Sequence, residues 1–504
     1  MTEAQDSVPD AAALRARAAE THVVVVGGGV SGMVAALECA KVGMRVTLLE
    51  AAERLGGAIR TADVGGLTLD VGAESYATRG GSVSALIAEL GLADRVVVPA
   101  GGRAWLAGIP GVGAAPMPAG GVLGIPENPF APEVRRVIGW SGSWRAYLDR
   151  LRPVLTIGHE HSLGALVRSR MGRAVLERLV APVVQGVYSA EPDTIDVDAA
   201  APGLNAALTR VGSLSGAVAV LRGERDPALA PGSAVEGLVG GMRSLVDALH
   251  ARLVGLGVDI RTGARVDGLS AASGANDRPG WSVTVLEDAP ENRDAAAPAI
   301  AADAVIVATE EIVARALLAP AVPGLAPQPD HEPPVVDVVT LVLDTPALDA
   351  APRGSGVLTV PGSHRAKALT HASAKWAWVG ESARAARPHR HVVRVSFGSQ
   401  GEPPATADLD GAAAIELARE QAAQLLGVDL SARDVVAGHI ERYAQSQPAS
   451  VIGRAARVAA ARTQVHAVPG LAVVGAWIAG TGLAQVVPDA RDEAERTRAQ
   501  LLWG

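Results

Sequence analysis

The run His22-Val23-Val24-Val25-Val26-Gly27-Gly28-Gly29-Val30-Ser31-Gly32 decides the fold of this 504-residue chain. Its β-branched first half, 22–26, is typical of a strand that is buried on both faces of a parallel sheet. The glycines at 27, 29 and 32 have the spacing G-x-G-x-x-G, which permits a tight turn and close packing of a helix on the strand. Apolar Met33 and Leu37 at helical spacing predict that this helix follows directly.

A second strand is predicted at Arg45–Leu49, and Glu50 stands at its end. A carboxylate in this position accepts hydrogen bonds from the ribose hydroxyls of an adenine dinucleotide. The positive N-terminal end of the preceding helix suits the pyrophosphate of the same ligand. A glycine-rich turn alone is weak support for a nucleotide-binding unit. Here the strand, the turn, the helix, the second strand and the acidic residue all follow in the order that such a unit requires. The sequence therefore predicts a Rossmann-type nucleotide-binding unit.

The next segment, Glu50-Ala51-Ala52-Glu53-Arg54-Leu55-Gly56-Gly57-Ala58-Ile59-Arg60-Thr61, bears on the choice between FAD and NAD. An extended Glu-x3-Arg-x-Gly-Gly segment resembles the flavin amine-oxidase superfamily, which includes protoporphyrinogen oxidases and phytoene desaturases. In that superfamily the Gly-Gly turn runs beside the pyrophosphate of FAD. The resemblance therefore implies FAD as the cofactor.

A second segment, Ala181-Pro182-Val183-Val184-Gln185-Gly186-Val187-Tyr188-Ser189-Ala190-Glu191, narrows this resemblance. It resembles a stretch of protoporphyrinogen and coproporphyrinogen oxidases in which a Pro-Leu-Val-like run leads to Gly-x-Tyr, a small pair and an acidic residue. The resemblance extends over the whole chain. It is strongest near the two ends and weakest over 100–180.

The resemblance also implies which residues lie beside the FAD. They come from the glycine-rich turn, the Gly-Gly segment, the turn after Asp70, a strand that holds the adenine, and a C-terminal glycine turn that meets the isoalloxazine ring. The predicted cofactor-binding residues are Gly27, Gly28, Gly29, Val30, Ser31, Gly32, Glu50, Arg54, Gly57, Ala58, Gly72, Ala73, Glu74, Ser75, Val266, Ala476, Thr481, Gly482 and Leu483. The Tyr/Trp pattern of the family is only partly kept in the C-terminal turn.

Three basic residues are predicted at the substrate. Arg103, in Gly-Arg-Ala-Trp, matches a family arginine proposed to pair with a propionate, and a guanidinium fork can bind both carboxylate oxygens. Arg79 lies in a loop near the flavin turn, and Lys375 belongs to a Lys-Trp segment that resembles bacterial members. An ordinary solvated surface role stays open for each of the three.

The length of the chain exceeds one ordinary core, so two or three domains are expected. The nucleotide-binding unit and the resemblance imply an α/β fold. A Rossmann-type FAD-binding domain is expected from three separate segments, 20–80, 232–315 and 464–504. Residues 81–231 are predicted to form a helical subdomain. Alternating β-branched runs and a helix at 411–426 predict an antiparallel-sheet substrate domain over 316–463.

Charge and composition argue against other classes of protein. A net charge of −8 disfavours a nucleic-acid partner, which normally requires a basic excess. Cys39 is the single cysteine, so no disulfide framework is expected and a reduced cytoplasm fits; we interpret Cys39 as a small core residue. No targeting signal or membrane span is expected, although peripheral membrane contact stays open. His159 and His161 show no third ligand, so no metal site is predicted.

The activity implied by the resemblance is a porphyrinogen oxidase of haem biosynthesis. FAD would accept hydrides from the reduced macrocycle and O2 would reoxidise it to give H2O2, in three two-electron passes that remove six electrons. Coproporphyrinogen III is preferred as substrate over protoporphyrinogen IX, because the chain resembles soluble bacterial members.

Two alternatives to a porphyrinogen oxidase stay open. One is an amine oxidase, although Cys39 cannot serve as the C-terminal cysteine that attaches FAD in many of those enzymes. The other is a non-catalytic flavin-fold protein that delivers porphyrin to a chelatase. A ferrochelatase is therefore a candidate partner.

Overall fold

The computed structural model of the protein describes residues 11–152, 161–223, 235–273, 279–287, 299–326, 334–444 and 450–503. Its organising element is a five-stranded sheet in which all neighbouring strands run parallel. In spatial order the strands are β12 (Asp259–Arg261), β2 (Arg45–Leu49), β1 (His22–Val26), β16 (Ala304–Val307) and β22 (Leu471–Val473). Every residue of β1 and β16 is buried, as central parallel strands require. The strands predicted at 22–26 and 45–49 are confirmed.

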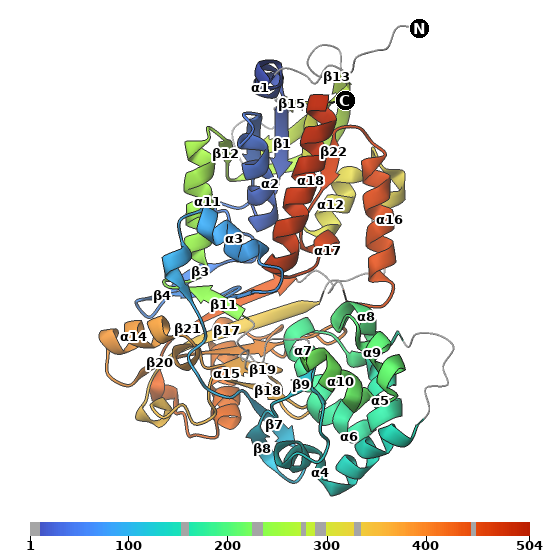
Figure 1. The fold of residues 1–504 in the computed structure, drawn as a ribbon. Coiled ribbons are helices and arrows are strands. Elements are labelled where there is room, and N and C mark those ends of the chain that lie inside the picture. Colours follow the sequence, from blue (N-terminus) through green and yellow to red (C-terminus); the bar gives the residue numbers. More distant parts are fainter. Residues whose placement is uncertain are drawn as a thin grey trace.

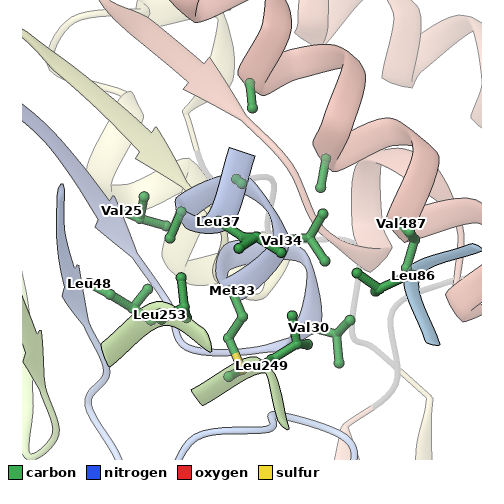
Figure 2. Packing of buried hydrophobic residues seen from close by; sticks show 14 of the residues in the cluster. Val25, Val30, Met33, Val34, Leu37, Leu48, Leu86, Leu249, Leu253 and Val487 are labelled. Carbon is green, nitrogen blue, oxygen red and sulfur yellow. The ribbon is translucent and has the colours of Figure 1, made fainter. Parts of the chain in front are cut away.

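Helices cover one face of the parallel sheet (Figure 1). The helix after the glycine turn, α2 (Val30–Ala40), packs in one apolar cluster with α3 (Ser82–Glu89), α11 (Arg243–Gly255) and α18 (Leu483–Trp503). Figure 2 shows Met33 of α2 extending toward Leu249 of α11. Cys39 is fully buried in this cluster, which confirms its interpretation as a core residue. The short helix α1 (Ala11–Glu20) precedes β1.

The opposite face of the parallel sheet carries a second, antiparallel sheet. Its strands are β13 (Ala264–Ser273), β14 (Pro279–Glu287) and β15 (Ala299–Ala302), and helices α12 (Glu311–Leu318), α16 (Arg454–His466) and α17 (Ala476–Ala479) lie on the same side. Val24 and Val26 contribute to this core, whereas Val23 and Val25 contribute to the core around α2. The alternation of side chains along one strand thus serves both cores.

A seven-stranded sheet forms the second large unit. In spatial order it contains β21 (Val435–Ala444), β17 (Val335–Asp344), β20 (Arg390–Phe397), β19 (Ala368–Thr370), β18 (Gly356–Thr359), β7 (Trp105–Ile109) and β8 (Gly113–Pro116). All neighbours are antiparallel except β18 and β7. The helix α15 (Gly411–Leu426) has the predicted bounds and buries Leu417 and Leu425 in one cluster with this sheet. Helices α13 (Ala372–Lys375) and α14 (Ala377–Ala386) precede β20.

A helical segment follows over 132–223, inside the predicted helical subdomain, but it does not stand alone. Its helices share one core with Leu106 and Ile109 of β7; they are α4 (Pro132–Tyr147), α5 (Leu163–Met171), α6 (Arg173–Val175), α7 (Ala181–Tyr188), α8 (Val197–Ala200), α9 (Leu204–Val211) and α10 (Leu214–Gly223). β7 and β8 lie within 81–231 in sequence, yet they extend the sheet built from 335–444. The predicted domain boundaries at 81, 232, 316 and 464 stay a prediction.

Three small sheets connect these units. They are the hairpin β3 (Thr61–Val64) with β4 (Leu67–Asp70), the hairpin β9 (Gly121–Val122) with β10 (Ile125–Pro126), and a ribbon of β5 (Tyr76–Ala77), β11 (Val235–Leu238) and β6 (Val96–Val97). In the ribbon, β11 pairs with β5 through one half and with β6 through the other. β11 therefore ties β5 and β6, which lie on either side of α3, to the segment before α11.

Among the described residues, no single helix combines the length and apolar character needed to cross a membrane. The pair α9 and α10, which is bent by 117°, meets these two criteria only when its members are taken together. Leu204 of α9 and Leu214 of α10 are fully buried in the core of the helical segment.

Candidate functional site

The turn after β1 needs glycine for steric reasons. Gly27 has a φ of 111°, and its N–H donates to the carbonyl oxygen of Leu49 at 2.7 Å. A Cβ at Gly32 would lie 1.9 Å from the carbonyl oxygen of Gly27, and a Cβ at Gly28 would lie 2.4 Å from Leu55 Cδ2. These contacts allow α2 to start directly against the end of β1.

Gly29 differs from these three glycines. It is the N-cap of α2, has a φ of −69°, and provides no side-chain cap. A Cβ at this position would meet only Gly57 Cα, at 3.9 Å. The first N–H groups of a helix have no intrahelical acceptor, so Val30, Ser31 and Gly32 present donors at a positively polarised end. The space beside Gly29 is thus suited to a phosphate group.

The Gly-Gly turn lies against the glycine-rich turn. Gly56 N–H donates to the carbonyl oxygen of Gly28 at 2.9 Å, and Gly29 and Gly56 form an isolated parallel bridge. Gly57 has a φ of 60°, and a Cβ there would approach Gly29 Cα at 3.1 Å. Ala58 and Arg54 are exposed beside this turn.

Glu50 is fixed at the end of β2 by two backbone donors. Its Oε2 accepts from Gly28 N at 2.6 Å and its Oε1 accepts from Ala52 N at 2.8 Å. A carboxylate has about four acceptor sites, so capacity remains for hydroxyl donors. The carbonyl oxygen of Glu50 accepts from Ala264 N, which starts β13. Val266, the predicted adenine contact, lies on this strand and is buried.

The turn Val71–Ser75 joins the cofactor segment to the seven-stranded sheet. Gly72 and Ala73 donate backbone hydrogen bonds to the carbonyl oxygens of Arg60 and Ala58, at 3.2 and 3.1 Å. A Cβ at Gly72 would lie 2.6 Å from the hydroxyl of Tyr443 on β21, so a larger residue does not fit. The structure therefore brings the predicted residues at 57–58 and 72–75 together. Ser75 is half-buried in the turn.

Glu74 is the electrostatic centre of this turn. Its carboxylate pairs with Lys375 Nζ at 2.6 Å and with Arg394 Nη1 at 2.7 Å. Burial alone would raise the pKa of Glu74, but the charges of Lys375 and Arg394 outweigh it and hold the pKa at about 2. Glu74 is thus ionised at neutral pH, and Lys375, which was predicted at the substrate, is one of its two counter-ions.

Sequence analysis missed Arg394 and Asp70. Arg394 donates from Nη2 to the carbonyl oxygens of Val71 and Gly72, at 3.0 and 2.6 Å, so it clamps the backbone of the turn. Burial raises the pKa of Asp70 to about 6, and its Oδ2 accepts from Met242 N at 2.8 Å. A single arginine on an alternating strand carries no local signal in the sequence. Asp70 does carry a signal, because it directly precedes the predicted turn.

The C-terminal turn presents the remaining cofactor candidates. After β22 the chain passes through Gly475, with a φ of 119°, into α17, and through Gly480, with a φ of 113°, toward α18. Thr481 is exposed, whereas Ala476, Gly482 and Leu483 are half-buried. The N-terminal end of α18 therefore adjoins a turn of small residues with accessible backbone.

The other two predicted substrate residues, Arg103 and Arg79, are exposed. Arg103 Nη1 pairs with Glu133 Oε1 at 2.5 Å, and its side chain is 58% exposed. Arg79 is exposed in the loop after β5, and its charge lowers the pKa of Tyr188, which burial raises more strongly. Tyr188 ends α7, in the segment 181–191 that resembles the porphyrinogen oxidases.

A cavity of about 580 Å³ lies between α7, the loop 361–367, the segment 398–405 and α15. Lys367 lines it and donates from Nζ to Ser189 Oγ at 2.6 Å, and burial lowers the pKa of this lysine to about 8. The residues that line this cavity do not include the predicted cofactor or substrate residues. The cavity is therefore separate from the cofactor turns.

Within the described part of the chain, no group of three or more His, Cys, Asp or Glu side chains is arranged to hold a metal ion. His159 lies outside the described residues. His161 Nδ1 lies 3.5 Å from Asp196 Oδ2.

Known proteins resemble this chain over nearly its whole length. The profile of the family described as flavin containing amine oxidoreductase matches residues 30–502. A coproporphyrinogen III oxidase of Mycobacterium tuberculosis (strain ATCC 25618 / H37Rv) is 33% identical over 470 residues, which cover 91% of this chain and 93% of the relative. The coproporphyrinogen III oxidase of Propionibacterium freudenreichii is 28% identical, over 95% of this chain and 91% of its own.

Solved structures share the fold. A candidate protoporphyrinogen oxidase of Exiguobacterium sp. 255-15 superimposes with a TM-score of 0.78 and 25% identity, covering 95% of this chain and 98% of its own. Cyclohexylamine oxidase of Brevibacterium oxydans IH-35A gives a TM-score of 0.64 at 14% identity, covering 96% of this chain and 99% of its own, and so shows the fold alone.

The glycine-rich turn and the second glycine turn lie against each other, Glu50 accepts from Gly28 N, and the family profile matches residues 30–502. The predicted resemblance to the flavin amine-oxidase superfamily and the α/β fold are confirmed. The protein therefore belongs to the flavin containing amine oxidoreductases and is a flavin-dependent oxidoreductase.

Proposed function

We propose that this protein is an FAD-dependent oxidase that converts coproporphyrinogen III to coproporphyrin III with O2. The observation that carries the proposal is the 33% identity with a coproporphyrinogen III oxidase over 91% of the chain. A protoporphyrinogen oxidase of Arabidopsis thaliana matches only 36% of the chain, at 27% identity. The extent of the first similarity favours coproporphyrinogen.

The residues around α2 fit FAD. The space beside Gly29 accepts a phosphate, the first turn of α2 supplies N–H donors, and Glu50 keeps acceptor capacity for ribose hydroxyls. The turns at 72–75 and 476–483 would hold the isoalloxazine end of the same cofactor. Bound FAD would supply the redox chemistry, since it accepts a hydride equivalent and passes two electrons to O2. Removing six hydrogens from the macrocycle consumes three O2 and gives three H2O2.

The protein's own contribution is to bind and orient the macrocycle and to exclude water from the site. Arg394 and Glu74 hold the backbone of the turn at 71–74 in place. Lys375 forms an ion pair with Glu74. We therefore assign to Lys375 the role of fixing the turn, and contact with the substrate as a second role. Arg103 and Arg79 are the exposed candidates for pairing with propionates.

The test is a comparison of two substrates on the purified holoenzyme. We expect kcat/KM with coproporphyrinogen III to exceed that with protoporphyrinogen IX, and three H2O2 to appear per macrocycle oxidised. Anaerobic addition of the porphyrinogen should bleach the flavin absorbance. Equal or better turnover of protoporphyrinogen IX would overturn the substrate assignment. An unbleached flavin would instead favour a non-catalytic binder, with a ferrochelatase as its candidate partner.

A further inference from the structure

The cavity of about 580 Å³ between α7 and α15 has a polar lining. Among the described residues that line it, glutamine, serine, threonine and charged side chains predominate, and Leu417 is the only large aliphatic residue. α7 and β18 lie side by side, and the loop 361–367 after β18 forms part of the wall (Figure 1). Burial of apolar surface drives the binding of apolar compounds, and these walls offer little of it. The cavity therefore suits a polar molecule.

Lys367, directly before β19, lines this cavity without a carboxylate partner among the described residues. Its Nζ donates to Ser189 Oγ at 2.6 Å. Burial lowers the pKa of Lys367 to about 8, and no charge of the described residues contributes to this shift. Glu402 and Glu420 also line the cavity, but neither lies within ion-pair distance of Lys367 Nζ. An ammonium group has three N–H donors, and Ser189 uses one of them, so two remain for an anion.

Arginine side chains add positive charge beside Lys367. Arg365 lines the same cavity, as does His364. The pKa of His364 is lowered first by burial and then by the charge of Arg353, so this second arginine lies close to the cavity as well. Within the described ranges, no carboxylate lies within ion-pair distance of Arg353 or Arg365. A chain of net charge −8 thus gathers several cations without carboxylate partners at one cavity.

Ser189, the acceptor for Lys367, is held in place by its backbone. It is the C-cap of α7 and has a φ of 52°, in the left-handed region that favours glycine. Its N–H donates to the carbonyl oxygen of Gln185 at 3.0 Å, and its own carbonyl oxygen accepts from Gln400 N at 2.7 Å. The residue is 4% exposed. The hydroxyl that orients Lys367 is therefore fixed before any ligand binds.

We propose that this cavity binds a small polar organic molecule through its phosphate or carboxylate group, which Lys367 Nζ holds. Arg365, on the same lining, supplies guanidinium donors, which pair well with both kinds of oxyanion. The side-chain amides of Gln185 and Gln424 line the cavity and bind hydroxyl groups in the rest of the molecule. Small-molecule sites usually measure about 300–1,000 Å³, so a cavity of about 580 Å³ fits an organic molecule better than a single inorganic ion.

The porphyrinogen is the competing occupant of the cavity, because its propionates are also carboxylates. The predicted substrate residues do not favour it, since Arg79, Arg103 and Lys375 do not line this cavity. The predicted flavin contacts do not line it either, so a macrocycle bound here would not contact the cofactor turns. A small anion that takes no part in the oxidation therefore fits the cavity better than the macrocycle does.

The chain contains only three lysines, Lys41, Lys367 and Lys375, so a lysine-specific probe gives a direct test. Pyridoxal 5′-phosphate carries an aldehyde and a phosphate. The aldehyde condenses with a neutral amine to an imine and water, and cyanoborohydride adds a hydride to the imine carbon while water protonates the nitrogen. Lys41 and Lys375 form ion pairs with glutamates. Peptide mass analysis of the labelled holoenzyme should therefore find at least about tenfold more label at Lys367, and pyridoxal, which lacks the phosphate, should label Lys367 about tenfold less.

Protection from this labelling identifies the bound group. Glucose 6-phosphate or glucuronate should protect Lys367, whereas uncharged glucose should not; protection by the first alone indicates a phosphate ligand and by the second alone a carboxylate ligand. Arg365→Ser should weaken the protection by about tenfold. The control Arg457→Ser, which replaces an exposed arginine of α16, should not.

Three results overturn the proposal. They are equal labelling of the three lysines, protection by glucose as strong as that by the charged sugars, and no protection by either charged sugar. In the last case, protection by coproporphyrin III would assign Lys367 to the macrocycle instead.

Discussion

Glu74 and Lys375 are 301 positions apart in the sequence and form an ion pair with an Oε1–Nζ distance of 2.6 Å. The second oxygen of the same carboxylate accepts from Arg394, which also holds the backbone of the turn. Three charges of alternating sign therefore connect the turn Val71–Ser75 to α13 and β20. The turn cannot shift without separating at least one buried pair.

This cluster predicts unequal effects of its three members. Glu74→Gln leaves two cations facing each other and should cost about 3–5 kcal/mol of unfolding free energy. Lys375→Met should cost less, because Glu74 keeps Arg394 as its partner. Urea unfolding of the holoenzyme measures both, and the flavin midpoint potential reports any change at the turn. An equal loss in the two variants would contradict the geometry.

Two neighbouring glycines separate folding from cofactor binding. Gly29→Ala and Gly29→Glu should fold, because a Cβ at this position has room, but Gly29→Glu should purify without FAD. Gly32→Ala should fail to fold, since its Cβ would lie 1.9 Å from the carbonyl oxygen of Gly27. Circular dichroism and flavin absorbance distinguish these cases. A folded, yellow Gly29→Glu protein would refute the cofactor site.

The carboxylate of Glu50 should contribute measurably to FAD affinity. A hydrogen bond to a charged group is worth about 1.5–3 kcal/mol, so Glu50→Ala should weaken FAD binding by roughly ten- to a hundredfold. Glu53, an exposed glutamate on the same segment, gives the control variant Glu53→Ala, which should bind normally. Titration of the apoprotein with FAD measures both. Equal affinities of Glu50→Ala and Glu53→Ala would rule out the ribose contact.

His371 should make stability depend on pH. The residue is 1% exposed, neither ring nitrogen has a hydrogen-bond partner among the described residues, and burial, with a smaller effect of His391, lowers the pKa of His371 to about 4. In the unfolded chain the pKa of His371 is near 6.5, so unfolded molecules bind the proton at a higher pH than folded molecules do. Stability should therefore be complete above pH 6.5 and decline toward pH 4, by roughly 3 kcal/mol in all.

The test for His371 compares the pH dependence of urea unfolding in variants. His371→Leu should flatten the decline between pH 6.5 and 4. Replacing the exposed His250 by Gln should leave it unchanged. The prediction fails if His371→Leu and the wild type lose stability in parallel.

Arg103 and Glu133 offer a test of propionate binding. If Arg103 pairs with substrate, Arg103→Ala should raise KM more than it lowers kcat, because this binding is similar in the ground and transition states. Glu133→Gln should then lower KM, since it frees Arg103 from its carboxylate partner. Steady-state kinetics with coproporphyrinogen III distinguishes the roles. Unchanged KM in both variants would show that Arg103 forms only a surface ion pair with Glu133.

Local patterns were sufficient for the nucleotide unit. The β-branched run at 22–26, the glycine spacing and the acid at Glu50 are determined by short-range sterics, and the structure places them as predicted. The helix at 411–426 was equally clear, because Asp410 accepts from Ala413 N as its N-cap and Gly427 closes it with a φ of 69°.

Long-range pairing was not visible in the sequence. β7 joins β18 in parallel, and this contact depends on the placement of segments far apart in the chain. Arg394 was missed for the same reason, because its importance comes from Glu74 and the carbonyl groups of the turn rather than from its own strand. Lys375 was singled out in the sequence, but its pairing with Glu74 could not be predicted.

The position of β22 in the sequence has a consequence for biosynthesis. β22 is the edge strand of the parallel sheet, and its partner β16 ends at Val307, so the ribosome must add β17 to β21, five of the seven strands of the large sheet, before this pairing can form. Val487 and Ala490 of α18, which complete the apolar cluster around α2, are made later still. A growing chain therefore carries an open strand edge and an uncovered helix, both of which favour aggregation. Deletions at the C-terminus should be far more harmful to soluble expression than deletions before His22, and an affinity tag belongs at the N-terminus.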